Sequence, residues 1–348
     1  AEGDSASNDR DGKSAEPAEP PQGREGEVEE ADIYRVDKNR LFYLNTYRGL
    51  LIYDVNDTKS PKLVSRVPVY GYPIEMYVKG DTLYALVKDA LYLTQESGKL
   101  KFDRQNVSQL VSIDISDLAN PKVLQTIDIE GLLREGVSRK IEDTIYVVSY
   151  MPKYYYRGWS YYYTGEEQKE KATVYSFNVG DPKNLVLVDK LQVLEGGGYY
   201  YNDNSISVSR YFQGVAISAT SNSLMVVENW YSYTRQQNNG GSYWCSDRKS
   251  EQQAIVSVID ISDPYGKIRT HTKFETSGSL TDQFKQTYIF DETTGKGTYY
   301  GIFARREWNS SNCESNNVIK NTLESWDITD GDNPTKLDDL EFGKPNET

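Results

Sequence analysis

The chain has 348 residues and a formal net charge of −13 at pH 7, with 52 acidic and 39 basic side chains. A chain this acidic is repelled by phosphate backbones, and no basic stripe with interleaved aromatic residues offsets the repulsion, so we expect no nucleic-acid partner. No stretch approaches the roughly 20 apolar residues of a membrane span, so we expect membrane contact only through a lipid anchor outside this chain.

The first 31 residues carry ten acidic and three basic side chains, no aromatic residue and many Pro, Gly and Ser. Such a composition cannot bury enough apolar surface to order itself. It predicts a disordered acidic tether over residues 1–31, ahead of a folded domain over residues 32–348. Stretches of this kind commonly follow the lipidated cysteine of exported lipoproteins, and an ordinary unstructured terminus is the alternative.

A short phrase built on apolar-apolar-Asp-apolar-x-Asp-x-Pro recurs along the rest of the chain. Its five copies are LIYDVNDTKSP at Asp54, VSIDISDLANP at Asp114, YSFNVGDPKN at Asn178, SVIDISDPYG at Asp260 and ESWDITDGDNP at Asp327. Successive copies lie 60, 64, 82 and 67 residues apart, which is longer than the roughly 40 to 50 residues of compact propeller repeats. The extra length falls between the second and third predicted strands of each repeat.

Each copy is preceded by a predicted hairpin and followed by one more β-prone run. The hairpins, such as IEMYVKGDTLYALVK, alternate apolar and polar residues around a tight polar turn. Runs such as KVLQTIDIE supply a fourth strand. Repeated four-stranded antiparallel units predict an all-β fold, a β-propeller, with blades at about residues 32–71, 72–131, 132–204, 205–278 and 279–348.

The LIYDVND and SVIDISDP phrases, with their hairpins, resemble the LVIVD-type family of secreted β-propeller domains, which is distantly related to WD-repeat proteins. The resemblance covers roughly residues 32 to 345. It implies a propeller fold and an exported protein. Because the family is largely without assigned activity, the resemblance carries over no catalytic residue.

The two ends of the predicted propeller share no strand that would close a ring. The chain enters on a first strand near Asp32 and leaves after a fourth strand near Phe342. Five blades could close without a shared strand, but we favour the front portion of a larger propeller.

Tyrosine is unusually frequent, with 29 residues against 9 Phe and 5 Trp. Most of the clustered tyrosines fall in connections from a second to a third strand, or from a fourth strand to the next blade, and these connections emerge on one side of a propeller. Rigid rings with polar tips suit the binding of glycans, peptides or protein loops, although the same rings could pack on each other and stiffen long insertions. The candidate ligand-binding residues are Tyr154, Tyr155, Tyr156, Arg157, Trp159, Tyr161, Tyr162, Tyr163, Tyr199, Tyr200, Tyr201, Trp230, Tyr231, Tyr233, Tyr243, Trp244, Arg305, Arg306 and Trp308.

Cys245 and Cys313 are the two cysteines of the chain, and they precede the phrases of the fourth and fifth repeats by 15 and 14 residues. They therefore fall in equivalent connections of neighbouring blades, and we expect a disulfide between them. A disulfide indicates an oxidising compartment, so we expect an extracytoplasmic protein, secreted or attached to the cell surface. Two free thiols are the alternative.

Sequence signals for catalysis and cofactor binding are weak. His271 is the single histidine and is expected on a surface strand, so we expect neither a multi-histidine metal centre nor a catalytic triad. Asp or Asn before a turn commonly caps it through local backbone hydrogen bonds. Ca²⁺ binding by the repeated phrase is the lesser alternative, weakened by Asn178 in the third copy, and we expect no cofactor.

The sequence thus predicts an extracytoplasmic cell-surface propeller whose aromatic loops bind a glycan or protein partner without catalysis. One alternative is a carbohydrate-active enzyme that uses two carboxylates, for which the sequence offers Glu166, Glu167 and Glu307 without pairing them. The other is a structural scaffold whose aromatic loops only stiffen it.

Overall fold

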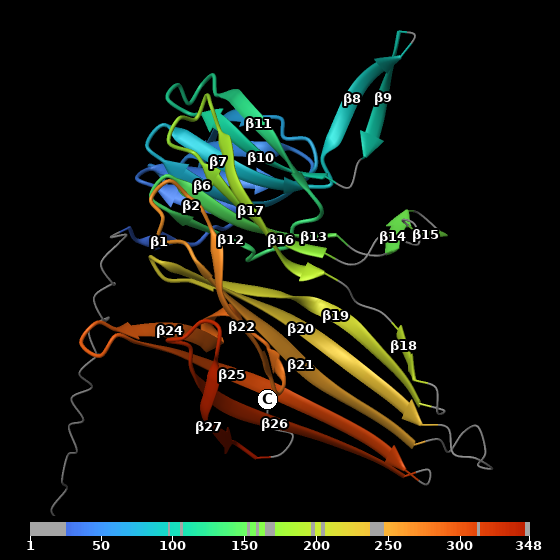
Figure 1. The fold of residues 1–348 in the computed structure, drawn as a ribbon. Coiled ribbons are helices and arrows are strands. Elements are labelled where there is room, and N and C mark those ends of the chain that lie inside the picture. The colour runs from blue at the N-terminus through green and yellow to red at the C-terminus, as the bar shows by residue number, and fades with distance from the viewer. Residues whose placement is uncertain are drawn as a thin grey trace, which may run out of the picture.

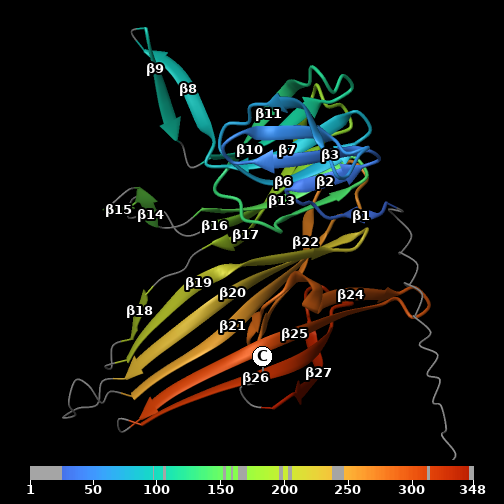
Figure 2. The same ribbon diagram turned by 180° about the vertical axis from the view of Figure 1, so that it is seen from behind.

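The computed structural model of the protein (Figures 1 and 2) consists almost entirely of antiparallel β-strands, which confirms the all-β prediction. It describes residues 26–96, 98–104, 107–151, 154–157, 160–163, 171–195, 199–202, 206–236, 247–311 and 314–344. Helical structure in these ranges is limited to the 3₁₀ turn η2 (Gln283–Lys285). In the described part of the chain, no helix has the length and apolar character needed to cross a bilayer.

Each repeat forms a four-stranded antiparallel sheet in which successive blade strands pair, as expected for propeller blades. The first blade contains β2 (Tyr34–Asp37), β3 (Arg40–Asn45), β4 (Gly49–Asp54) and β5 (Lys62–Val67), and the second contains β6 (Tyr72–Lys79), β7 (Thr82–Lys88), β10 (Val107–Asp114) and β11 (Lys122–Glu130). The third contains β12 (Ser138–Ile141), β13 (Thr144–Met151), β16 (Lys171–Asn178) and β17 (Val186–Glu195). The fourth contains β19 (Ile206–Ala219), β20 (Ser223–Gln236), β21 (Asp247–Asp260) and β22 (Arg269–Thr276), and the fifth contains β24 (Gln286–Asp291), β25 (Lys296–Ser311), β26 (Glu314–Asp327) and β27 (Thr335–Phe342).

The predicted long loops between second and third strands are largely β-structure. The second blade carries the hairpin β8 (Leu91–Glu96) and β9 (Lys99–Arg104), and the third carries β14 (Tyr154–Arg157) and β15 (Ser160–Tyr163), while β18 (Tyr199–Asn202) pairs with β19. In the fourth and fifth blades the strands themselves lengthen: β20, β21 and β26 have 14 residues and β25 has 16. Figure 1 shows all of these extensions projecting to the same side, the right of the view.

Pairing between the extended strands joins the fourth and fifth blades. β21 pairs with β25 from Arg248↔Ser310 to Glu251↔Glu307. A short strand, β23 (Ser279–Leu280), also pairs with β25. The two blades therefore form one ten-stranded sheet.

The repeated phrase folds as two successive Asx turns in all five blades. The side-chain oxygen of its first residue accepts the backbone N–H two positions later, at 2.9 to 3.0 Å, in the pairs Asp54–Asn56, Asp114–Ser116, Asn178–Gly180, Asp260–Ser262 and Asp327–Thr329. Its second Asp repeats the bond at 2.8 to 3.1 Å in the pairs Asp57–Lys59, Asp117–Ala119, Asp181–Lys183, Asp263–Tyr265 and Asp330–Asp332. Because only an acceptor oxygen is needed, Asn178 serves as well as Asp. The turn-capping interpretation is confirmed.

Each phrase is also tied to the turn of the preceding hairpin. The residue after its first Asp or Asn donates its N–H at 2.8 to 2.9 Å in the bonds Val55→Asn39, Ile115→Asp81, Val179→Asp143, Ile261→Asn222 and Ile328→Gly297. Just before the first Asp or Asn of each phrase, the pairing between the third and fourth strands shifts register. The shifts lie between residues 52/53, 112/113, 176/177, 258/259 and 325/326. A bulge of this kind increases strand twist, and its recurrence gives the five blades the same local geometry.

The apolar core lies between neighbouring blades rather than inside any one of them. Phe42 and Ile52 of the first blade share a cluster with Leu83 of the second, and Phe274 of the fourth stacks on Trp326 of the fifth with ring centroids 4.5 Å apart. His271, expected on a surface strand, is half-buried at the same junction, where its Nε2 lies 2.7 Å from the carbonyl oxygen of Ile328. Blade-to-blade burial of apolar surface therefore supplies the main stabilisation.

One face of the fifth blade exposes side chains at positions whose equivalents in the second blade are buried against the third blade. Tyr84 and Tyr300 occupy equivalent positions, because each pairs with the serine two residues before the first Asp of its phrase. Ile129 and Phe342 are equivalent in the same way, because each pairs with the residue six positions before that Asp. Tyr84 and Ile129 are 2% and 0% exposed, whereas Tyr300 and Phe342 are 36% and 42% exposed. This face thus has the residue pattern of a blade-to-blade contact.

An additional strand, β1 (Val28–Glu29), pairs with the innermost strand of the third blade. Val28 lies opposite Ile141, and Glu29 lies opposite Lys140. Farther along, the carbonyl of Asp32 accepts the N–H of Met76 in the second blade, and the carbonyl of Ile33 accepts the N–H of Leu44 in the first, both at 2.8 Å. Figure 2 shows β1 close to β2 and β6. Residues 28–33 therefore cross the inner edges of three blades.

The prediction of a disordered tether is wrong for residues 26–31, and residues 1–25 lie outside the described part of the chain. The physical reason is a pair of buried cations. The side chains of Arg139 and Lys140 are each 2% exposed, and they pair with Glu30 and Glu29 respectively. Leaving a buried cation without its anion costs several kcal/mol, and this offsets the conformational entropy that residues 26–31 lose when they become ordered.

A buried carboxyl group, Glu75 of β6, links the second blade to the third. It accepts hydrogen bonds from the backbone N–H groups of Gly136 and Val137 and from the hydroxyl of Ser138. Burial raises the pKa of Glu75 to about 7, although these hydrogen bonds and Arg139 oppose the shift.

Replacing Asn178 tests the turn cap. Asn178→Asp keeps the oxygen that accepts the Gly180 N–H, so we expect the free energy of unfolding to change by less than about 0.5 kcal/mol. Asn178→Ala removes the acceptor and should lower it by about 1 kcal/mol. Urea denaturation with and without EDTA measures both, and a marked loss of stability in EDTA would instead support Ca²⁺ binding by the phrases.

Replacing Glu75 tests the contribution of its buried carboxyl group to stability. Its pKa of about 7 lies above the ordinary value of 4.5, so its stabilising contribution is complete below pH 4.5 and is lost as the pH rises through 7. Glu75→Gln keeps an acceptor oxygen but cannot ionise. We expect the free energy of unfolding of the native protein to fall by about 3 kcal/mol relative to this variant between pH 4.5 and 7.5, at 1.4 kcal/mol per pKa unit. Parallel denaturation profiles for the two proteins would contradict this.

Candidate functional site

The predicted aromatic residues lie on strands that extend from one side of the propeller. We call this the loop side; it is where second strands run into third strands and fourth strands run into the next blade. β14 and β15 carry Tyr154 to Arg157 and Tyr161 to Tyr163, β18 carries Tyr199 to Tyr201, and β25 carries Arg305, Arg306 and Trp308. Trp159, Tyr243 and Trp244 lie outside the described residues. The structure therefore brings the described aromatic segments to one side, where Figure 1 shows them.

The tyrosine runs pair with each other in the third blade. Tyr154, Tyr155 and Tyr156 of β14 lie opposite Tyr163, Tyr162 and Tyr161 of β15. This arrangement follows from the high β-propensity of tyrosine, which favours a hairpin over an irregular loop. The hairpin places six tyrosines in one short ribbon on the loop side.

Trp230 differs from the expectation of an exposed ligand-binding ring. It is 1% exposed and packs edge-on against Phe212 at 5.5 Å, while Phe212 stacks on Tyr150 at 4.4 Å. Its ring therefore belongs to the core between the third and fourth blades, because the buried face of β20 continues as far as this position. Tyr231, the next residue, is half-buried with its ring 6.4 Å from that of Tyr211.

Three further candidates are more accessible than Trp230. Tyr233 and Arg305 are half-buried, and Arg306 is exposed. All three lie on the long strands of the ten-stranded sheet. They remain candidates for contact with a ligand.

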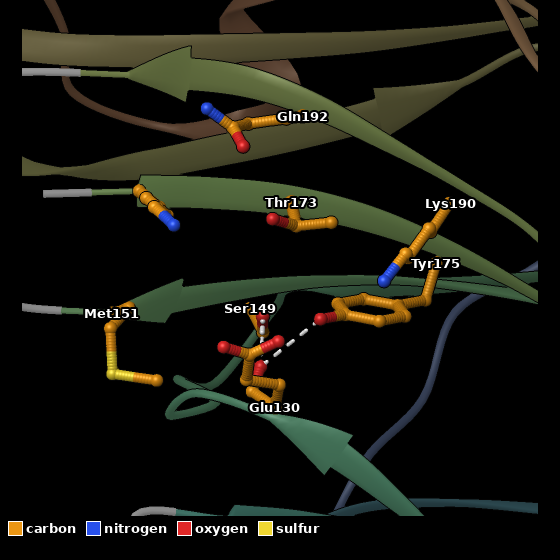
Figure 3. A pocket seen from close by; sticks show the side chains of 8 residues that line it. Glu130, Ser149, Met151, Thr173, Tyr175, Lys190 and Gln192 are labelled. Atoms are coloured by element: carbon orange, nitrogen blue, oxygen red, sulfur yellow. Dashed lines mark hydrogen bonds between the residues drawn. The ribbon is translucent and has the colours of Figure 1, made fainter. Parts of the chain in front are cut away.

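A cavity of about 230 Å³ opens on the loop side of the third blade (Figure 3), and we call it the blade 3 pocket. The residues that line it come from the ends of β11, β13, β16 and β17, and they are Glu130, Ser149, Met151, Lys171, Thr173, Tyr175, Lys190 and Gln192. β13 ends just before the tyrosine hairpin, and β16 begins after it. The pocket and the hairpin therefore belong to the same connection of the same blade.

Local hydrogen bonds fix the floor of the blade 3 pocket. The hydroxyl of Ser149 donates to the backbone carbonyl of Glu130 at 2.7 Å, and the Tyr175 hydroxyl donates to the same oxygen at 3.4 Å. Burial raises the pKa of Tyr175 and keeps its hydroxyl protonated. Figure 3 shows Lys190 beside Tyr175, with Thr173 and Gln192 farther along the wall. The pocket thus offers several donors and acceptors that suit a ligand rich in hydroxyl groups.

Sequence analysis did not identify the blade 3 pocket. Ser149, Thr173 and Gln192 occupy ordinary strand positions, and none belongs to a recognisable motif. The available signal was weak: polar residues near the loop-side ends of several strands. Residues brought together from four strands leave no local pattern in the sequence.

The structure gives limited support for carboxylate catalysis. Among the eight described residues that line the blade 3 pocket, Glu130 alone carries a carboxyl group, whereas glycoside hydrolysis commonly uses a pair. Glu307 pairs with Glu251 in the ladder between β21 and β25, and Glu166 and Glu167 lie outside the described residues. Within the described ranges, no group of three or more His, Cys, Asp or Glu side chains is placed to hold a metal ion.

Cys245 and Cys313 lie outside the described residues, so their disulfide stays a prediction.

Comparison with known proteins supports the propeller fold. No curated protein matches the chain. A family model described as a beta propeller domain matches residues 24–319, from just before β1 into β26. This span covers most of the chain, including all strands of the first four blades. The chain belongs to the beta propeller domain family.

Proposed function

We propose that the protein is an extracytoplasmic binding module that recognises a glycan with its loop side and does not transform it. The observation that carries the proposal is the blade 3 pocket, a polar cavity at the base of a hairpin in which six tyrosines pair. A protein partner, a carbohydrate-active enzyme and a scaffold are the competing functions.

The chemistry of the pocket favours a glycan over a protein loop. Its lining offers two ammonium groups, an amide and several hydroxyls against one methionine, and sugars present hydroxyl groups in a comparable density. Tyrosines next to such a pocket can provide rigid apolar area with polar tips. The lone carboxyl of Glu130 favours binding over hydrolysis.

The ladder between the fourth and fifth blades supports the proposed disulfide. Partners in this ladder run from Glu251↔Glu307 to Arg248↔Ser310. Cys245 and Cys313 each lie two residues in the sequence from an end of these strands, Asp247 of β21 and Ser311 of β25, so we propose a disulfide between the two blades. A disulfide at this point supports an oxidising, extracytoplasmic location.

Two further considerations agree with that location. The LVIVD-type resemblance, which is finer than the family assignment, implies export. The acidic residues 1–25 suit a spacer between a cell surface and the propeller.

Glycan binding can be tested with a panel of surface polysaccharides and the intact chain. We expect saturable binding that weakens at least tenfold in a Thr173→Val/Gln192→Leu variant, because both changes keep side-chain bulk and remove hydrogen bonds. Replacing Tyr154, Tyr155 and Tyr156 by Ser should have a similar effect. Lys122→Gln, on the opposite side of the propeller, is the matched control.

Isothermal titration calorimetry gives the affinities, and the melting temperature of each variant shows that it is folded. Equal binding by the native protein, the Thr173→Val/Gln192→Leu variant and the tyrosine-to-serine variant would contradict the proposal. Binding of envelope proteins but of no polysaccharide would contradict the ligand class, and release of shortened sugars would contradict binding without catalysis.

The disulfide can be tested by peptide mapping without reduction. We expect a linked pair of peptides containing Cys245 and Cys313. Single and double replacements by Ser should lower the free energy of unfolding equally, by about 2 to 4 kcal/mol for a loop of this length. Alkylation of both cysteines in the unreduced, denatured protein would contradict the bond.

A further inference from the structure

A second cavity on the loop side, which we call the blade 1 pocket, has a different chemistry from the first. It measures about 330 Å³ and lies between the β3–β4 turn, the β5–β6 connection and the start of β8. Its lining shares no residue with the blade 3 pocket. Its size is at the lower end of the range for small-molecule sites.

Three tyrosines contribute to the blade 1 pocket and are open to solvent. Tyr47, Tyr70 and Tyr72 are 91%, 52% and 37% exposed. An exposed ring of this size is held away from the core, so its apolar face is available to a ligand.

The lining is positively charged, in contrast to the rest of the chain. Arg48 and Arg66 line the pocket, and none of the eleven described residues that line it is acidic, although the chain has 52 acidic against 39 basic side chains. The structure records no ion pair between either arginine and any residue that it describes. A guanidinium group binds planar anions through two parallel hydrogen bonds.

The turn that presents Tyr47 and Arg48 is fixed by local bonds. The side-chain oxygen of Asn45 accepts the N–H groups of both residues at 3.0 Å, and Arg66 Nε donates to the carbonyl of Arg48 at 2.6 Å. Gly49 closes the turn with a φ of 74°, where a Cβ atom would lie 2.2 Å from the carbonyl oxygen of Val67. Such a turn loses little conformational entropy when a ligand binds.

We propose that the blade 1 pocket binds a sugar unit that carries an anionic group, with the ring against the tyrosines and the anion on Arg48 and Arg66. This site adds a charge requirement to the glycan recognition proposed above, and it rests on separate residues. The shared ligand chemistry is a pyranose with a carboxylate or a sulfate ester.

The experiment uses the intact chain and three oligosaccharides of equal length: an oligogalacturonate, the galactan obtained by reducing its carboxyl groups, and a sulfated galactan. We expect saturable binding of at least one anionic oligosaccharide and at least tenfold weaker binding of the neutral one. Preference between the two anionic forms then identifies the anion.

Two variants assign the binding to this pocket. Arg48→Gln leaves its backbone carbonyl in place for Arg66, and Tyr47→Ser alters a side chain that is 91% exposed, so neither should disturb folding. We expect each to raise the Kd for the anionic ligand at least tenfold. Arg35→Gln, which changes the net charge equally on a strand outside the pocket, should leave it unchanged.

The result separates the two pockets. The Thr173→Val/Gln192→Leu variant should retain the charge-dependent binding, whether or not the blade 3 pocket binds a glycan. Equal affinity for the neutral and anionic oligosaccharides, or equal losses in Arg48→Gln and Arg35→Gln, would overturn the proposal.

Discussion

The arrangement of the blades depends on one buried guanidinium group, that of Arg139 on β12. Arg139 donates to the carbonyl of Ile217 in the fourth blade at 2.6 Å and to the side-chain oxygen of Gln283 ahead of the fifth at 2.7 Å. Glu30 of the N-terminal segment lies 3.5 Å away. A cation with its side chain 2% exposed requires these partners, so three blades and the N-terminal segment meet where it lies.

Away from Arg139, the blades are stabilised by local turns and by contact with their neighbours. The double Asx turn and the bulge before it use only residues within one repeat, so each blade can form its outer half independently. The apolar faces are complete only when a second blade covers them, as Phe274 and Trp326 show. Local signals thus determine the shape of a blade, and burial between blades determines their order.

This division explains how much could be predicted from the sequence. The propeller and the turn caps were predicted because their signals lie within a few residues of one another, and Asn178 fits the same bond as Asp. The order of residues 26–31 was missed because Glu29 finds its partner, Lys140, 111 residues away in the chain. Trp230 was misplaced because strand β20 remains buried farther than the loop boundary suggested. The two pockets combine residues from separate strands, which no local pattern shows.

The ladder between β21 and β25 also has a mechanical consequence. A force applied to the far ends of the fourth and fifth blades is shared by both, because four registered residue pairs join them edge to edge. The second and third blades instead extend separate hairpins, β8–β9 and β14–β15, whereas the long strands of the fourth and fifth blades form one sheet (Figure 1). A ligand that pulls on one of the paired blades therefore loads the other.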